Sequence, residues 1–395
     1  MMSALRDFVA GPWRAVLVLG VTQILAWGAI FYTPVLIVPL IAAERGWSIT
    51  FGMAGFSLAL LTAGLVSPRT GFLIDRFGGH RVMPFGSLLG ALGLVGLVYA
   101  DHPVAYLAVW MLLGVAISGS LYDPAFATLG RIFGAAARQP ITALTLAGGF
   151  ASTVSWPTTY GLLQVLGWKD TYLVYAALLA FVAAPLHAFA LPRTRAVADV
   201  RPSDSAKPPP PVHAASGTIF LLLLAAFASY AFIPSGLSAH LLAIFQRAGI
   251  DPGTVVVIGA LFGPSQVAAR LCEFIFARNV HPLWIARFAV GLLIASFGLL
   301  WLFGFSPPVA VVFAIMFGVA NGLSTIARGA VPLALFGASG YGRIIGRIAA
   351  PALVITSIAP LVVAFVAERF SDGNALSVAA GFAALSFVCF MLIRK

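Results

Sequence analysis

Long apolar runs limit the fold of this chain more than any other feature. About twelve runs reach roughly 20 residues, the length at which a helix crosses a bilayer. Only 9% of the 395 residues are charged, whereas soluble proteins carry roughly 25%. So few charges cannot cover a water-exposed surface, so the sequence predicts an all-α membrane protein. The runs centre near Trp27, Leu61, Ala91, Ile117, Ser152, Leu179, Tyr230, Phe262, Ile294, Gly318, Thr356 and Phe382.

The basic residues between these runs predict the orientation. With both termini in the cytoplasm, seventeen of the 23 Lys and Arg residues fall inside and only Arg45, Lys169, Arg247 and Arg369 fall outside. The positive-inside rule favours this arrangement, which places the chain in the cytoplasmic (inner) membrane. The net charge of +11 therefore indicates topology and contact with the lipid bilayer, and we expect no nucleic-acid partner. The first run is too long for a cleavable signal peptide.

A polar segment divides the runs six and six. Residues 192–215 are rich in proline and charge, which is typical of a flexible linker. We therefore predict an N-terminal six-helix bundle over residues 1–191 and a C-terminal one over residues 216–395. Sequence echoes at offsets of 202 or 203 residues support an internal duplication. The echoes are Phe72-x-x-x-Arg76 with Phe274-x-x-x-Arg278, Phe133-Gly134 with Phe336-Gly337, and Pro157 with Pro360.

A glycine-rich charged segment follows the second predicted span. It contains Gly71, Asp75, Arg76, Gly78 and Arg81 in the order G-F-L-I-D-R-F-G-G-H-R. A glycine lets helices approach closely, and an aspartate is favoured at a helix N-terminus. The segment resembles the loop signature G-x-L-x-D-R-x-G of the major facilitator superfamily in spacing and position.

This resemblance implies a fold of two pseudo-symmetric six-helix bundles, which we expect to act as a monomer. It further implies secondary transport by alternating access, with the loop locking the halves together when the transporter faces outward. The bases Arg76, His80 and Arg81 would then pair with Asp123 on span four. A proton-carrying role for Asp123 is the alternative.

A narrower resemblance covers most of the chain. Residues 28–32 (GAIFY), Pro34 and residues 46–48 (GWS) resemble the start of the monocarboxylate porter and oxalate:formate antiporter branch. In that branch an arginine on span eight meets the substrate carboxylate, which implies this role for Arg270. Gln266 stands where animal porters place an aspartate, span one lacks their lysine, and residues 348–367 carry no charge. These departures narrow the expected substrate to an anion with a single carboxylate group.

Arg270 is also notable without the resemblance, because it stays ionised within an apolar run. Placing an arginine in lipid costs about 3 kcal/mol on insertion scales. It could bind a carboxylate in bidentate fashion or pair with Glu273, three residues further on. Both readings hold if Glu273 releases Arg270 to the substrate and carries a coupling proton, because burial favours a protonated carboxyl.

Other polar and aromatic residues within the spans are candidates for lining a cavity. Arg328 could line the inner vestibule, pair with Glu273 or snorkel to the headgroups. We take His187 and His240 as interfacial, and Pro157 and Pro360 as either hinges or packing kinks. The predicted substrate-lining residues are Arg270, Gln266, Trp27, Tyr32, Tyr122, Tyr230 and Asn321, with Gln23 and Trp156 as further polar and aromatic groups in their spans.

Several other classes lack their motifs. The sequence has no GK[ST] loop for ATP, no HExxH or GxSxG pattern for catalysis, and only two cysteines, so we expect no enzyme, cofactor or resident metal. A channel fits the composition, but the duplicated halves favour a transporter. An exporter of amphipathic drugs and a non-transporting receptor or assembly factor remain alternatives. The predicted function is transport of a small organic anion, driven by protons or by exchange.

Overall fold

The computed structural model describes residues 11–193, 217–238 and 240–394. Nearly all of these residues are helical, and the described part of the chain contains no strand. Within these described ranges, ten continuous helical stretches are long and apolar enough to cross a membrane. The predicted all-α membrane fold is therefore confirmed. Most of the predicted linker, 192–215, lies outside the described residues.

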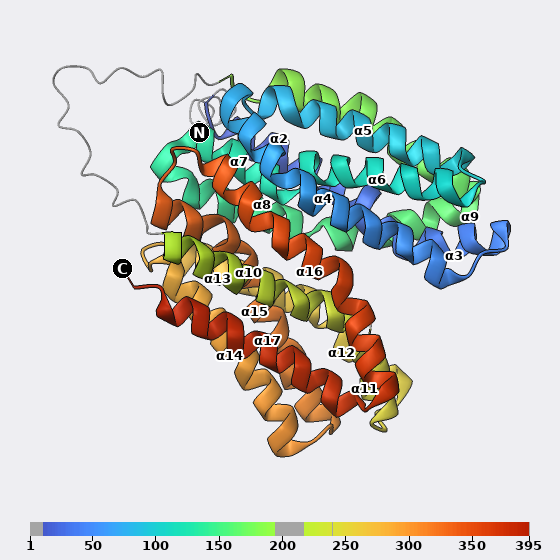
Figure 1. Cartoon of the computed structure of the whole chain (residues 1–395), viewed down its shortest axis with the longest axis vertical. Coiled ribbons are helices and arrows are strands. Elements are labelled where there is room, and N and C mark those ends of the chain that lie inside the picture. Colours follow the sequence, from blue (N-terminus) through green and yellow to red (C-terminus); the bar gives the residue numbers. More distant parts are fainter. Residues whose placement is uncertain (1–10, 194–216, 239, 395) are drawn as a thin grey trace, which may run out of the picture. The chain divides into compact units, whose positions relative to one another are not determined.

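The backbone contacts divide the chain into two compact units, which we treat separately (Figure 1). Unit 1 comprises residues 1–213 together with 336–350, and unit 2 comprises residues 214–335 and 351–395. The beginning of the penultimate helix thus packs with unit 1, although it follows 122 residues of unit 2 in the sequence. The division at residues 192–215 remains a prediction.

Unit 1 begins with one span made of three consecutive helical segments. A six-residue π-helical turn, Trp27–Tyr32, separates α2 from α3, and the span ends where Gly46 takes a left-handed φ of 67°. α4 and α5 each pack against α6. The helices of unit 1 are α2 (Arg14–Ala26), α3 (Thr33–Arg45), α4 (Ile49–Phe77), α5 (Gly79–Tyr99), α6 (Pro103–Ser120), α7 (Tyr122–Phe133), α8 (Arg138–Gly149) and α9 (Ala151–Leu178).

One helical stretch, Pro103–Ala190, is 88 residues long and cannot be a single crossing. Its backbone leaves helical geometry at Gly134 (φ 57°) and at Gly167 (φ 75°). Glycine reaches positive φ without the penalty of a Cβ, so these residues mark the turns. They divide the stretch into three segments of membrane-spanning length. With the other nine stretches, this is consistent with twelve crossings.

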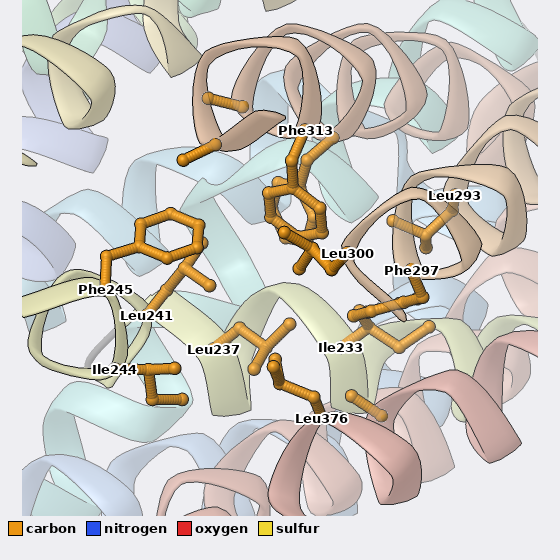
Figure 2. Close-up of a cluster of buried hydrophobic side chains, with 14 of the residues drawn as sticks. Ile233, Leu237, Leu241, Ile244, Phe245, Leu293, Phe297, Leu300, Phe313 and Leu376 are labelled. Atoms are coloured by element: carbon orange, nitrogen blue, oxygen red, sulfur yellow. The ribbon is translucent and has the colours of Figure 1, made fainter. Parts of the chain in front are cut away.

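Unit 2 is built around an apolar core (Figure 2). Phe245, Phe297 and Phe313 come from three different helices, and both Phe245 and Phe297 pack against Phe313 with ring centroids 5.9 and 5.7 Å away. Such contacts contribute about 0.5–1.5 kcal/mol beyond area burial. The helices of unit 2 are α10 (Gly217–Ser238), α11 (Leu241–Arg247), α12 (Pro252–Ala260), α13 (Phe262–Phe276), α14 (Pro282–Phe303), α15 (Pro307–Phe336), most of α16 (Tyr341–Arg369) and α17 (Asp372–Leu392).

Local landmarks recur in both halves at a spacing of 203 residues. The chain turns through positive φ at Gly46 and again at Gly249. Two residues later, Ser48 caps α4 by accepting from Phe51 N, and Asp251 caps α12 by accepting from Thr254 N. Gly134 and Gly337 likewise both have positive φ. The same turn chemistry at the same spacing supports the internal duplication.

Two sequence interpretations change once the packing is known. His187 is fully buried, and its ring nitrogens bond Thr22 Oγ1 at 2.8 Å and Ser87 Oγ at 3.1 Å. The interfacial placement was wrong, because three helices of unit 1 meet around this ring. In unit 2, Pro360 lacks an N–H and leaves Thr356 O without its helical donor. Ser235 Oγ donates to that oxygen at 2.7 Å, which favours a fixed kink.

Candidate functional site

Arg270 lies on α13 where this helix crosses α15 at very short range. Gly318 and Gly322 of α15 make the approach possible: a Cβ at Gly318 would lie 2.7 Å from Ser265 Cβ, and one at Gly322 would lie 2.6 Å from Gln266 O. Small residues four apart are the usual means of close helix packing in membranes. The crossing therefore depends on these two glycines, which have no side chain, and it places Gln266 and Arg270 directly against α15.

The Arg270 side chain is 4% exposed and is held by polar atoms of both helices. Its Nε donates to Gly322 O at 3.5 Å, and its Nη2 donates to Thr325 Oγ1 at 3.3 Å and to Gln266 Oε1 at 3.4 Å. These distances are at the long end for hydrogen bonds. Polar atoms of both helices thus contact the buried guanidinium.

Two further hydrogen bonds extend the polar contacts of Arg270 along α15 and on to α10. Thr325 Oγ1 donates to Asn321 O at 2.9 Å, and Asn321 Oδ1 accepts from Tyr230 Oη of α10 at 2.6 Å. Arg270, Thr325, Asn321 and Tyr230 are therefore linked across three helices of unit 2. The structure thus brings together the four residues of this half that were predicted to line the substrate site, namely Arg270, Gln266, Asn321 and Tyr230.

Glu273 follows Arg270 by three residues on α13, so both lie on one face of the helix. It is 3% exposed. Arg328, on α15, is half-buried. Unit 2 therefore buries an acid and a base within one helical turn, in a helix apolar enough to cross a membrane.

Unit 1 contains an aromatic cluster on its first span and on α7. The Trp27 ring lies 4.7 Å from Phe31, 6.0 Å from Tyr32 and 5.1 Å from Tyr122, measured between centroids. Tyr122 also stacks on Phe126 at 5.3 Å with an interplanar angle of 8°. The three aromatic residues predicted from the sequence for this half thus do meet. Trp27 is only partly buried.

The π-helical turn explains how these rings come together. Thr33 N–H donates to Gly28 O, five residues back, in the register of this wider turn, and Thr33 Oγ1 donates to the same oxygen at 2.5 Å. Gln23 orients the Trp27 ring by accepting from its Nε1 at 3.1 Å, while Gln23 Nε2 donates to Ser120 O at 2.7 Å. The tryptophan is therefore fixed by a buried amide that is itself anchored on α6.

The loop motif places its aspartate against the beginning of α16 within unit 1. Asp75 Oδ1 accepts from Gly342 N at 2.8 Å, and Asp75 Oδ2 accepts from Arg343 N at 2.7 Å. Gly71 lies so close that a Cβ there would meet Gly342 O at 2.0 Å. A carboxylate at a helix N-terminus satisfies unpaired N–H groups and the helix dipole. The predicted preference of Asp75 is thus met by a helix some 270 residues away in sequence.

The basic residues of the motif are more exposed to the surroundings than Asp75. Arg76 and Arg81 are exposed, and the Arg76 guanidinium lies 5.1 Å from the centroid of the Phe77 ring. Gly78 joins α4 to α5 with a φ of 84°. Arg131 of α7 reaches the motif and donates to the main-chain oxygens of Ile74 and Asp75.

Four contributors were not singled out from the sequence: Thr325, Arg131, Gly318 and Gly322. The two glycines carried a usable signal, because G-x-x-x-G in an apolar run predicts a close helix crossing. Thr325 and Arg131 carried none, since their roles depend on which helices become neighbours.

These features define the class of protein: it is a multi-pass α-helical membrane protein of two units that keeps charged and polar groups buried within its spans. Residues 19–348 match the family described as Major Facilitator Superfamily, and the chain belongs to this family. No curated protein sequence matches the chain.

Solved structures with similar folds come from the same superfamily. The human organic anion transporter MFSD10 (TETRAN) is 18% identical, with a TM-score of 0.75 over 96% of this chain and 99% of that one. The proton:xylose symporter XylE is 11% identical, with a TM-score of 0.71 over 96% and 95%. FucP, in its outward conformation, is 13% identical, with a TM-score of 0.71 over 96% and 98%. At these identities the likeness concerns the fold.

Proposed function

We propose that this chain is a secondary active transporter that moves a small organic anion, a monocarboxylate, across the cytoplasmic membrane by alternating access. Arg270 binds the carboxylate. The observation that carries the proposal is a buried guanidinium in an apolar helix, with long hydrogen bonds of 3.3–3.5 Å to Gly322 O, Thr325 Oγ1 and Gln266 Oε1.

The internal repeat supports a role for this charge beyond helix packing. By the repeat spacings of 202 and 203 residues, Arg270 corresponds to Pro68 or Ser67 and Glu273 to Gly71 or Thr70 of unit 1, all of them uncharged. In unit 1, the Thr70 and Ser118 hydroxyls lie 3.0 Å apart and join α4 to α6 without any charge. Hydroxyl groups thus provide the helix contact there, while unit 2 bears the cost of burying an arginine. Such a cost indicates a role beyond stability.

The geometry of Arg270 suits exchange with a ligand. A carboxylate accepts two parallel N–H bonds from a guanidinium at about 2.7–2.9 Å, roughly twice as strong as neutral bonds. The bonds from Arg270 Nη2 to Thr325 Oγ1 and Gln266 Oε1 are longer than this, at 3.3 and 3.4 Å. Substrate would therefore replace long bonds by short charge-assisted ones. Tyr230 and Asn321 would orient the remainder of the anion from the same unit.

Coupling is assigned in the proposal to Glu273, with Asp123 as the second candidate. Glu273 is 3% exposed and lies on the face of α13 that carries Arg270. In the proposal, carboxylate binding at Arg270 is linked to proton uptake by this neighbouring acid. Proton and anion would then move together. Glu273→Gln is expected to abolish pH-driven uptake and to spare exchange.

Reconstituted protein tests the assignment. Proteoliposomes are loaded with one carboxylate, and saturable uptake of lactate, pyruvate and larger organic anions is compared for wild type, Arg270→Ala and Arg270→Lys. Losing a bidentate charged contact of about 3 kcal/mol lowers the affinity more than 100-fold. Lysine keeps the charge and loses the fork, so it should restore only part of the uptake. Arg278→Ala, at an exposed site just past α13, is the matched control.

Export of amphipathic compounds is the second candidate function, and the aromatic cluster around the partly buried Trp27 favours it. Aromatic surface binds apolar groups of many shapes. Dye efflux that survives Arg270→Ala would support this function and contradict the anion proposal. Stable, folded protein that transports neither class would instead point to the receptor or assembly role.

A further inference from the structure

An apolar groove lies on the surface of the last span of unit 1. This span contains two π-helical segments, η3 (Leu179–Ala183) and η4 (Leu186–Ala190). The groove has a volume of about 420 Å³. Its two phenylalanines, Phe181 and Phe189, are 80% and 79% exposed, so the groove opens outward. The lining residues are all apolar: Phe181, Val182, Pro185, Leu186, Phe189 and Ala190.

The two faces of this span differ sharply in burial. Phe181, Pro185 and Phe189 follow one another at intervals of four residues, which places them on one face of a helix. Ala183 and His187, on the opposite face, are fully buried. Both π-helical segments pack against α2 and α5 on that buried side. The groove therefore faces away from the bundle, toward the surrounding lipid.

Basic side chains gather at one end of the groove. Arg193 follows the lining residue Ala190 by three positions and is exposed. Arg81, near the start of α5, is also exposed, and α5 packs against η4. The charged side chains that act electrostatically on His80 are Arg81, Arg131 and Arg193, which are all positive. The end of the groove at the predicted cytoplasmic side therefore carries a positive potential.

The neighbouring helix α5 has the same pattern as the last span. Arg81 is followed by Phe85, Leu88 and Leu92, at spacings of four, three and four residues that keep them on one face. These three side chains are 68%, 46% and 59% exposed. On both spans, an outward apolar face thus ends in an exposed arginine at the same end. A phospholipid is built in this way too, with apolar chains below a phosphate.

We propose that the groove binds one acyl chain of an anionic phospholipid, whose phosphate pairs with Arg193 and Arg81. A guanidinium binds phosphate oxygens through two parallel bonds, and basic pockets beside transmembrane helices bind anionic headgroups. A zwitterionic lipid carries its own cation beside the phosphate, so it gains less from the two arginines. The proposal is independent of the proposed function, and Arg270→Ala should leave the lipid binding unchanged.

Lipid binding to the purified full-length protein tests the role of the arginines. Phosphatidylglycerol and phosphatidylcholine with identical acyl chains are titrated in non-ionic detergent, and bound lipid is counted by native mass spectrometry. We expect one phosphatidylglycerol to bind more tightly than phosphatidylcholine. Arg193→Ala and Arg81→Ala should each weaken its affinity about fivefold. Arg278→Ala, at an exposed site just past α13 in unit 2, is the matched control and should behave as wild type.

A second pair of variants tests the groove itself. Phe189→Ala removes one side of the groove and should reduce phosphatidylglycerol binding. Phe288→Ala removes a ring of α14 that is 61% exposed and lies outside the groove, and should have no effect. All these side chains are exposed, so each variant should keep the wild-type Tm, which is measured alongside.

Several outcomes would overturn the proposal. Equal affinity for the two lipids, or unchanged phosphatidylglycerol binding in Arg193→Ala and Arg81→Ala, would remove the headgroup contact. Equal losses in Arg278→Ala would show that general surface charge is responsible. Displacement of phosphatidylglycerol by inorganic phosphate would indicate a simple anion site, and dimerisation that blocks lipid binding would assign the groove to a second copy of the chain.

Discussion

The close crossing of α13 and α15 predicts a large effect from adding one methyl group. In Gly322→Ala, the new Cβ would lie 2.6 Å from Gln266 O and 3.0 Å from Gln266 Cα, both on the backbone of α13. Backbone atoms cannot rotate away as a side chain can, so the helix itself must shift. Overpacking of this kind costs about 1–3 kcal/mol.

The same shift would disconnect Arg270 from its partners. Ordinary contact at Cβ begins near 3.4 Å, so α13 must retreat by about 0.5–1 Å if the full overlap is relieved. The Arg270 contacts to Gly322 O and Thr325 Oγ1 are already 3.5 and 3.3 Å long, at the limit for hydrogen bonds. We therefore expect Gly322→Ala to lower both Tm and carboxylate binding.

Two further variants calibrate this result. Gly263→Ala lies on α13 itself, where an added Cβ meets nothing within 4 Å, and should leave both properties unchanged. Gly318→Ala meets Phe262 O at 2.9 Å on the same face and should reproduce the defect. Tm and equilibrium binding are measured on purified protein. Wild-type stability and binding in Gly322→Ala would refute the close crossing and the positioning of Arg270 derived from it.

Three other predictions concern unit 1 and the outer surface of unit 2. Asp75→Ala leaves two N–H groups of α16 without their acceptor and should lower the free energy of unfolding by about 1–3 kcal/mol. The control is Asp101→Ala, because the Asp101 side chain is 83% exposed and its loss should cost far less. Equal losses of Tm in the two variants would contradict the capping role of Asp75. His187→Ala removes a fully buried ring that joins three helices and should lower Tm strongly through the cavity it leaves, so a wild-type Tm would argue against this packing. Asp372→Asn weakens a bidentate bridge to the half-exposed Arg247, with bonds of 2.7 and 2.8 Å, and the expected loss is about 1 kcal/mol or less, shrinking further in high salt.

The sequence was most informative where local chemistry sufficed. Long apolar runs predicted helices because a backbone in lipid must satisfy its own hydrogen bonds, whatever the neighbours are. Positive-φ glycines and capping residues recur where the repeat predicted, since turn geometry depends on a few adjacent residues. The loop motif likewise identified Asp75 and Gly71 as constrained positions. It could not identify their partner on α16.

Arg270 illustrates the same limit of what the sequence can predict. Its cost in an apolar run was visible from the sequence, and Gln266, one turn earlier, was the natural neighbour. The role of Thr325 was not visible, nor was the dependence of the whole cluster on Gly318 and Gly322. Helix pairing in a membrane follows shape and backbone approach more than sequence spacing.

Local sequence patterns were enough to indicate a lipid environment, the helices, the repeat and the charged residues whose burial in lipid is energetically costly. Tertiary structure alone decided which residues meet: Asp75 with the N-terminus of α16, and His187 with Thr22 and Ser87. Each of these groupings joins segments far apart in sequence, and only the packing of whole helices brings such segments within hydrogen-bond reach.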